Sequence, residues 1–314
     1  MNRRIGLLVI GFIVLAVCVG AYGADQRHRV LLIDGQNNHD WRSTTPMIKA
    51  ALERSGLFVV TVATTPATSA PAGDWAKLDV HFGDFAAVVS NFTDFGAAPA
   101  PKKFLDDLSS YVRNGGALVV VHAATSGMNH YPEYSRLVGM GWRDVQGGDR
   151  LYLDESGKAI RQLKGQGEGT VHGKPFQWAV TMWAAAHPVC AGLPRVWQHE
   201  VDELWGAPRG VAENVEILAT AVPPETQRNE PVIWTVRYGK GRVFVNMLGH
   251  DANAMRCVGF QTILARGCEW AISGRVTLAV PESFPTREKT SLFRGNVNPE
   301  KVSGTSRESG EPVR

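Results

Sequence analysis

Short apolar runs alternate with helical patterns along the first half of the chain. The runs cover residues 29–34, 57–63, 85–89 and 117–121, and each is bounded by Gly or polar residues, as is typical of buried parallel strands. Helical spacing separates them twice, over residues 45–56 and 104–115. In the first helix we expect Thr45 to be the N-cap and Pro46 to lie in the first turn. This alternation predicts an α/β fold whose mostly parallel sheet is flanked by helices.

The second half of the chain is less regular. Residues 139–210 are rich in Gly, Trp and His and predict an inserted lobe with short antiparallel strands. Regular strands return at 215–219, 232–236 and 242–246, with a hairpin turn at 239–241, and a closing helix follows over 260–271. The polar tail 285–314 has little to bury, so we expect it to be disordered. The folded domain is thus predicted to span 24–284.

The N-terminus has the pattern of an export signal. Arg3 and Arg4 precede an apolar run from Ile5 to Val19, and small residues follow at 21 and 23. This pattern predicts a signal peptide over residues 1–23 and a periplasmic or secreted protein without stable membrane insertion. An uncleaved membrane anchor and a lipoprotein modified at Cys18 are the alternatives.

Charge and cysteine content narrow the classes of partner. The 314-residue chain has a net charge of +3 and no basic block, which argues against nucleic acid as a partner. Cys190, Cys257 and Cys268 remain after export. Their odd number leaves at least one thiol unpaired within the chain.

Imidazoles and carboxylates follow several of the predicted strands. His39, His122 and His250 each come after an apolar run, and Asp202 and Glu203 lie in the irregular segment. Carboxyl ends of parallel strands share one edge, so we expect the three histidines to meet in one pocket. There they would bind zinc or a similar ion at about 2.0–2.1 Å, or transfer protons near neutral pH. The alternative is that each His only bonds its own loop; the remaining histidines are interpreted as surface or loop residues.

The chain lacks a recognisable covalent nucleophile. No Cys and no Gly-x-Ser-x-Gly stands at a strand-to-helix elbow, and alanines follow His122. Trp41 and Trp142 lie in predicted loops, where indole rings are suited to stacking on sugars. Core packing is the alternative for both. Asn38, Trp41, Trp142 and Asp202 are the expected substrate-binding residues.

Five motifs together resemble the ThuA-like (trehalose utilisation) family. They are residues 31–41, 115–124, His187-Pro188, 202–204, and 238–243 leading to 248–251. The resemblance implies a flavodoxin-like fold of the class I glutamine amidotransferase-like superfamily and a role in sugar catabolism. It carries over His39, His122, His187, His250, Asp202 and Glu203 as site residues. The stretch 134–145 departs from the family pattern, which puts the substrate-facing side of the lobe in doubt.

These observations favour an exported enzyme that acts on a glycoside or 3-keto-sugar by hydrolysis, elimination or isomerisation. His122, His39 and Glu203 are the expected catalytic residues, and His39, His122 and His250 are the expected ligands of a divalent metal. No glutamine amidotransferase activity is expected. A non-catalytic carbohydrate-binding protein with a Trp-lined cleft, or a structural module on an enzyme fold, are the alternatives.

Overall fold

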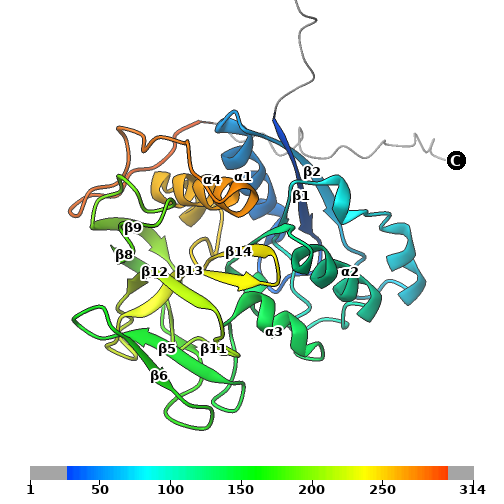
Figure 1. Cartoon of the computed structure of the whole chain (residues 1–314), viewed down its shortest axis with the longest axis horizontal. Helices are drawn as coiled ribbons and strands as arrows, with labels where there is room; N and C mark the ends of the chain where they lie inside the picture. The colour runs from blue at the N-terminus through cyan, green and yellow to red at the C-terminus, as the bar shows by residue number, and fades with distance from the viewer. Residues whose placement is uncertain (1–26, 296–314) are drawn as a thin grey trace, which may run out of the picture.

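The computed structural model describes residues 27–295, so the predicted signal peptide lies outside the described part. A nine-stranded sheet runs through the molecule in the order β2-β1-β3-β4-β14-β13-β12-β8-β9 (Figure 1). Its parallel half consists of β1 (His28–Asp34), β2 (Phe58–Thr64), β3 (Ala87–Ser90), β4 (Ala117–Val121) and β14 (Gly241–Asn246). The predicted α/β architecture is therefore confirmed.

Antiparallel strands extend the sheet beyond β14. They are β13 (Glu230–Tyr238), β12 (Val215–Ala221), β8 (Phe176–Met182) and β9 (Val196–Asp202). The predicted turn joins β13 to β14 as a hairpin. β8 and β9 fall within the segment predicted to be a lobe, yet they form the edge of the main sheet, because their backbone groups pair with β12 and with each other.

Helices cover both faces of the parallel half (Figure 1). α1 (Trp41–Arg54) and α4 (Val258–Ser273) pack together on one face, and α2 (Lys102–Arg113) and α3 (Pro132–Val138) on the other. α1 starts four residues earlier than predicted, because the Asp40 carboxylate caps the Ser43 amide. Pro46 consequently lies inside the helix. No helix of residues 27–295 is long and apolar enough to cross a membrane.

The remaining strands form a small lobe beside the sheet. β5 (Asp149–Leu153), β6 (Ala159–Gln162) and β11 (Arg209–Gly210) make one small sheet, and β7 (Val171–His172) pairs with β10 (Trp205–Gly206). A buried ion pair between Arg150 and Glu230 ties the lobe to β13. This contact fixes the lobe against the carboxyl edge of the main sheet.

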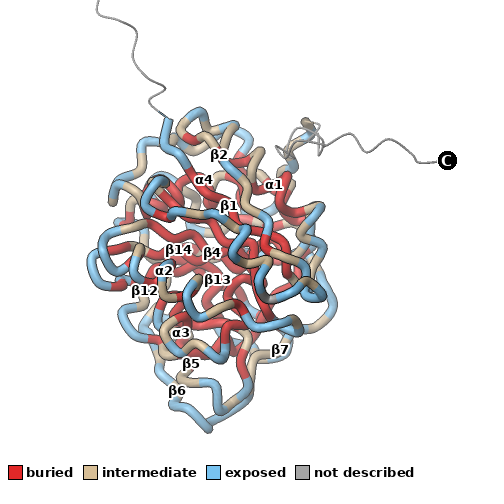
Figure 2. The backbone as a smooth tube through the Cα atoms, turned by 90° about the vertical axis from the view of Figure 1, so that its right-hand side faces the viewer, coloured by how far each residue is buried: buried red, intermediate tan, exposed pale blue. Residues whose placement is uncertain are grey.

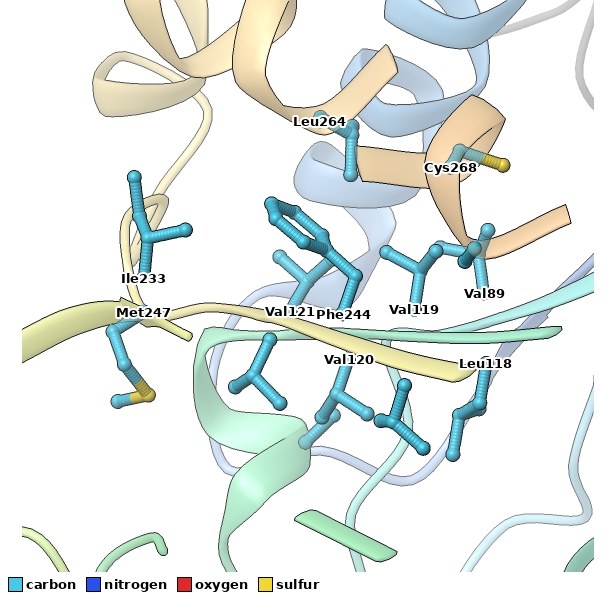
Figure 3. Packing of buried hydrophobic residues seen from close by; sticks show 14 of the residues in the cluster. Val89, Leu118, Val119, Val120, Val121, Ile233, Phe244, Met247, Leu264 and Cys268 are labelled. Carbon is cyan, nitrogen blue, oxygen red and sulfur yellow. The ribbon is translucent and has the colours of Figure 1, made fainter. Parts of the chain in front are cut away.

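The core lies between the sheet and the helices. Buried residues follow the central strands, whereas the tip of the lobe around β6 is exposed (Figure 2). Figure 3 shows Val119, Val121 and Phe244 directed towards Leu264 of α4. A Cβ at Gly267 would lie 2.2 Å from the Phe244 ring, so only glycine lets α4 approach β14 this closely.

The C-terminal segment is ordered further than predicted. Residues 285–295 run along the body of the protein, where Gln198 N donates to Thr286 O (2.8 Å) and Val258 N donates to Ser291 O (2.8 Å). The Arg54 guanidinium lies 3.5 Å from the centre of the Phe293 ring. These contacts compensate for the low apolar content on which the disorder prediction rested; residues 296–314 lie outside the described part.

Candidate functional site

His122 occupies the elbow at the end of β4. Its φ is +44°, a left-handed conformation that non-glycine residues rarely adopt and that concentrates at functional sites. A single helical turn, His122–Thr125, follows, and Thr125 Oγ1 donates to His122 O (2.9 Å). Tyr134 further anchors this turn by donating to Ala124 O (2.6 Å). The strained elbow thus presents an imidazole at the carboxyl end of β4.

The loop after β1 holds His39. Asn37 Oδ1 accepts from His39 N (2.8 Å) and lies 3.3 Å from His39 Nδ1, while Asn37 Nδ2 donates to Asn91 O (2.9 Å). Gly35 begins the loop at φ +114°, and a Cβ there would lie 2.3 Å from Thr65 Oγ1. The loop is therefore fixed to the neighbouring strand ends, and one side of the His39 ring is anchored.

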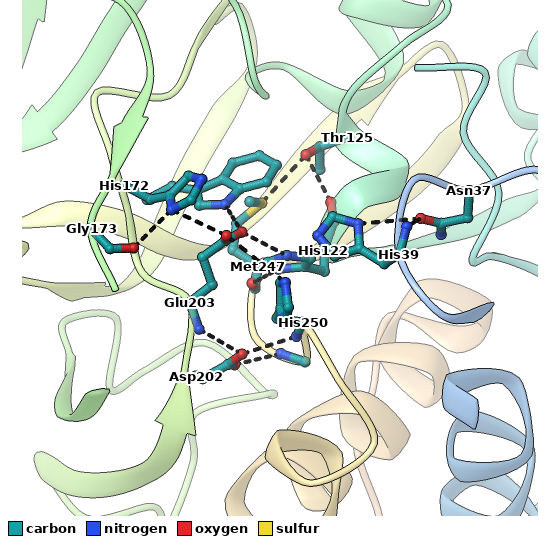
Figure 4. A network of polar contacts seen from close by, with 12 residues as sticks. Asn37, His39, His122, Thr125, His172, Gly173, Asp202, Glu203, Met247 and His250 are labelled. Atoms are coloured by element: carbon teal, nitrogen blue, oxygen red, sulfur yellow. Dashed lines mark hydrogen bonds and ion pairs between the residues drawn. The ribbon is translucent and has the colours of Figure 1, made fainter. Parts of the chain in front are cut away.

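His39, His122 and His250 meet beyond the carboxyl edge of the sheet, as predicted. Their ring centroids are 5.0 Å apart for His39 and His122, 4.5 Å for His39 and His250, and 5.5 Å for His122 and His250. Each pair of rings is nearly perpendicular. Figure 4 shows the cluster beside the carboxylate of Glu203.

Glu203 stands between this cluster and the lobe. Its Oε2 accepts from Trp205 Nε1 (2.6 Å) and lies 3.3 Å from His122 Nε2. Its Oε1 lies 3.2 Å from His172 Nδ1 and 3.9 Å from His250 Nε2. The sequence predicts His172 as a surface or loop residue, and its side chain is indeed exposed, but the contact with Glu203 is not predicted. No local sequence signal marks it, because the two-residue strand β7 brings it to Glu203 only through its pairing with β10.

Asp202 does not face a substrate, contrary to the prediction. Its carboxylate is buried and accepts from His199 Nε2 (2.8 Å) and from the amides of Glu203 (2.9 Å), Gly249 (2.7 Å) and His250 (3.0 Å). It therefore fastens the loop of His250 to the end of β9. His199, likewise assigned to the surface, is fully buried beside it.

The surroundings of the site shift the pKa values of His39, Glu203 and His122. Burial, together with the neighbouring His122 and His250, lowers the pKa of His39 to about 3. Burial opposes ionisation of Glu203, but the contacts with His122 and Trp205 prevail and lower its pKa to about 2. Burial likewise opposes charge on His122, but Glu203, Asp202 and the Met247 carbonyl outweigh it and raise its pKa. The site therefore favours charge on His122 and Glu203 and disfavours it on His39.

Three residues of the site lie close enough together to be candidate ligands of one metal ion. One ligand atom from each of His39, His122 and Glu203 lies within 4.8 Å of the others. His122 Nδ1 is 2.6 Å from Met247 O, so it carries the proton, and the buried Nε2 has no hydrogen-bond partner among the described residues. Imidazole ligands of metals are commonly oriented by such a backbone bond on the other nitrogen. This group contains Glu203, whereas the ligand set predicted from the sequence contains His250 as its third member.

The predicted sugar platforms lie on two sides of the cluster. Trp142 packs against His172 and Trp205, with ring centroids 5.2 Å and 5.1 Å away, and Trp205 packs against His122 (5.1 Å). Trp41 and Asn38 instead line a separate cleft of about 510 Å³. His187 does not join the cluster: it packs against Trp270, and its Nδ1 accepts from Val189 N (3.2 Å).

Comparison with known proteins agrees with the fold and with the family resemblance. A ThuA-like protein from Parabacteroides merdae shares 34% identity, with a TM-score of 0.79 over 85% of this chain and 98% of that one. A ThuA-like protein from Bacteroides uniformis shares 17% identity, with a TM-score of 0.52 over 82% and 96%. No curated protein matches the chain. The family model for ThuA, described as trehalose utilisation, matches residues 29–271, and the chain belongs to this family.

Proposed function

We propose that this protein is an exported enzyme of sugar catabolism whose site binds a divalent metal, with zinc as the first candidate. The observation that carries the proposal is the anchoring of two imidazoles. His122 Nδ1 is bonded to a backbone carbonyl and His39 Nδ1 faces Asn37 Oδ1, and one nitrogen of each ring lies within 4.8 Å of a Glu203 carboxylate oxygen. Two neutral nitrogens and one carboxylate match the ligand set of catalytic zinc sites, which keep one position open.

The raised pKa of His122 supports a cation at this position. In the absence of metal, Glu203 Oε2, which lies 3.3 Å from Nε2, favours a proton on His122. A divalent ion would displace that proton and serve the same carboxylate. Bound there, it would polarise a carbonyl or hydroxyl oxygen of the substrate. His39 and His122, expected to be catalytic, would then contribute as ligands.

His250 is the residue placed to move a proton. Its ring lies 4.5 Å from that of His39, its side chain is about one-third exposed, and its amide is held by Asp202. A carbon–hydrogen bond beside a ketone is acidic enough for an imidazole base when the carbonyl is polarised. Removal of that proton begins an elimination or isomerisation of a 3-keto-sugar and needs no covalent nucleophile.

The substrate class follows from the family and from the walls of the site. The family is described by trehalose utilisation, and Trp142 is half-buried beside the cluster, against the rings of His172 and Trp205. Indole and imidazole faces suit the apolar faces of a sugar ring. Export rests on the N-terminal sequence alone.

The test is metal analysis of the purified protein, followed by turnover of a panel of 3-keto-glycosides and plain disaccharides with and without chelator. We expect bound metal, turnover of a keto-glycoside, and loss of turnover with chelator. His122→Ala should lose the metal and lower turnover roughly 10²-fold or more, whereas His81→Ala, whose side chain is 78% exposed, should retain both. Sugar affinity that survives His122→Ala, without turnover by any form, would instead favour a binding protein.

A further inference from the structure

A cleft opens at the same edge of the sheet as the histidine cluster. β1 lies between β2 and β3, and the helices that follow β1 and β3 cover opposite faces, so the loops diverge at this point (Figure 1). Such a switch in strand order leaves a crevice outside the carboxyl ends of the strands, where ligands of α/β proteins commonly bind. The cleft has a volume of about 510 Å³, within the range of small-molecule sites.

One loop connects this cleft to the proposed metal site. The segment from Gly35 to Asn38, together with Trp41, lines the cleft, and His39 within the same loop belongs to the histidine cluster. Asn37 contributes to both: it lines the cleft and accepts from the His39 amide. A ligand in the cleft would therefore lie beside Asn37, whose side chain accepts the hydrogen bond from the His39 amide.

The lining of the cleft, whose one charged side chain within residues 27–295 is Arg42, is suited to a hydroxyl-rich ring. Gln36 is only 4% exposed; its Nε2 donates to Pro66 O (2.9 Å), but its Oε1 has no partner among the described residues. A buried amide oxygen without a donor is rare, and a sugar hydroxyl in the cleft that Gln36 lines is a candidate donor. Asn38 and Phe95 are exposed in the lining, and Trp41 carries the Arg42 guanidinium 4.3 Å from its ring centre. The lining residues include no carboxylate.

We propose that this cleft binds the non-reacting ring of a glycoside whose reacting ring lies at His39, His122 and Glu203. The proposal rests on the proposed function, because it assigns the second half of the same substrate. It also predicts specificity: ligands with two sugar rings bind more tightly than ligands with one. The side chains that make the difference are Gln36, Asn38 and Phe95.

The experiment is calorimetric titration with one-ring and two-ring sugars. The probes are methyl glucosides, maltose, cellobiose and trehalose. We expect at least one disaccharide to bind roughly 10-fold or more tightly than its methyl glycoside, on the scale of one or two net hydrogen bonds. Asn38→Ala and Phe95→Ala should remove most of that difference while leaving affinity for the methyl glycoside unchanged. Leu163→Ala, which truncates an exposed apolar side chain in the lobe, should behave as wild type.

Two results would overturn the subsite. One is the absence of any preference for two rings over one; the other is an equal loss of affinity for both ligand sizes in the Asn38 and Phe95 variants. A two-ring preference that depends on Asn38 and Phe95 supports the subsite even when the protein carries no metal and turns over no sugar. In that case the proposed catalytic function fails and the subsite stands.

Discussion

His122 combines a costly backbone with a buried functional side chain. A non-glycine residue in the left-handed region costs about 1–2 kcal/mol, and here the surrounding turn enforces it through Thr125 and Tyr134. This backbone conformation places an imidazole that is held by Met247 O and directed at Glu203. We interpret the strain as a consequence of function.

This interpretation predicts an unusual order of stability. His122→Gly should be more stable than His122→Ala by about 1 kcal/mol, because glycine adopts positive φ without a Cβ clash. Both variants lose the imidazole. The difference between their free energies of unfolding therefore reports the backbone strain alone. Denaturant unfolding measures it, and an alanine variant that is the more stable of the two would contradict the strain.

The buried pair of His199 and Asp202 predicts a pH dependence of stability. Burial opposes charge on His199, but the bond to Asp202 prevails and raises its pKa to about 9; the unfolded value is about 6.5. A raised folded pKa adds stability that is complete below about 6.5 and is lost as pH rises through about 9. Cys257 also faces this ring, and its pKa is lowered by it.

We therefore compare wild type with His199→Gln, which keeps a donor but cannot carry charge. The free energy of unfolding of wild type should exceed that of His199→Gln by the largest amount near pH 6. This difference should shrink towards pH 10. The same trend in a Cys257→Ser background would exclude the thiol as its source. An excess that stays constant or grows with pH would show that His199 is neutral in the folded protein.

At the scale of elements, the C-terminal segment covers a buried thiol. Leu292 forms an isolated bridge with Cys257, Phe293 N donates to Arg256 O (2.8 Å), and Cys257 is fully buried. Cys190 and Cys268 are buried elsewhere. Access to Cys257 should therefore depend on whether this segment opens.

Phe293→Ala removes the ring under Arg54 and should favour local opening by about 1 kcal/mol. Native-state alkylation of Cys257, followed by mass spectrometry, should become roughly 5-fold faster, while Cys268 labels at its wild-type rate. Equal acceleration at both cysteines would indicate global destabilisation. Because no cysteine belongs to the proposed site, labelling should leave any turnover intact; inactivation traced to a cysteine would refute that assignment.

At the scale of the whole molecule, the site joins three distant parts of the chain. His39 follows β1, His122 follows β4, and Glu203 follows β9 at the far edge of the sheet. An ion bound by all three would connect the parallel half of the sheet to its antiparallel edge. The folded protein alone offers this geometry, so binding must raise its stability.

Zinc should therefore raise the melting temperature of metal-free protein. At a free concentration about 100-fold above Kd the expected gain is about 2.7 kcal/mol. His39→Ala should abolish the shift and His81→Ala should keep it, as measured by thermal unfolding with and without chelator. A shift of equal size in the His39 variant would place the ion elsewhere.

The parallel half of the fold could be predicted because its signals are local. β4 has the predicted bounds, and the hairpin turn and the closing helix occur where expected, since burial on both faces leaves continuous apolar runs that need no partner to be recognised. Strand ends then placed His39, His122 and His250 at one edge. The convergence of these three rings followed from sequence pattern and topology.

The features that only the tertiary structure decided depend on pairing between segments that are distant in the sequence. A two-residue strand is too short to show a periodic pattern, so the sequence around His172 did not predict its contact with Glu203. The burial of His199 and the four bonds to Asp202 arise only once β9 lies beside the loop after β14. Sequence patterns record which side chains avoid water, whereas the partner of a buried polar group is set by the path of the whole chain.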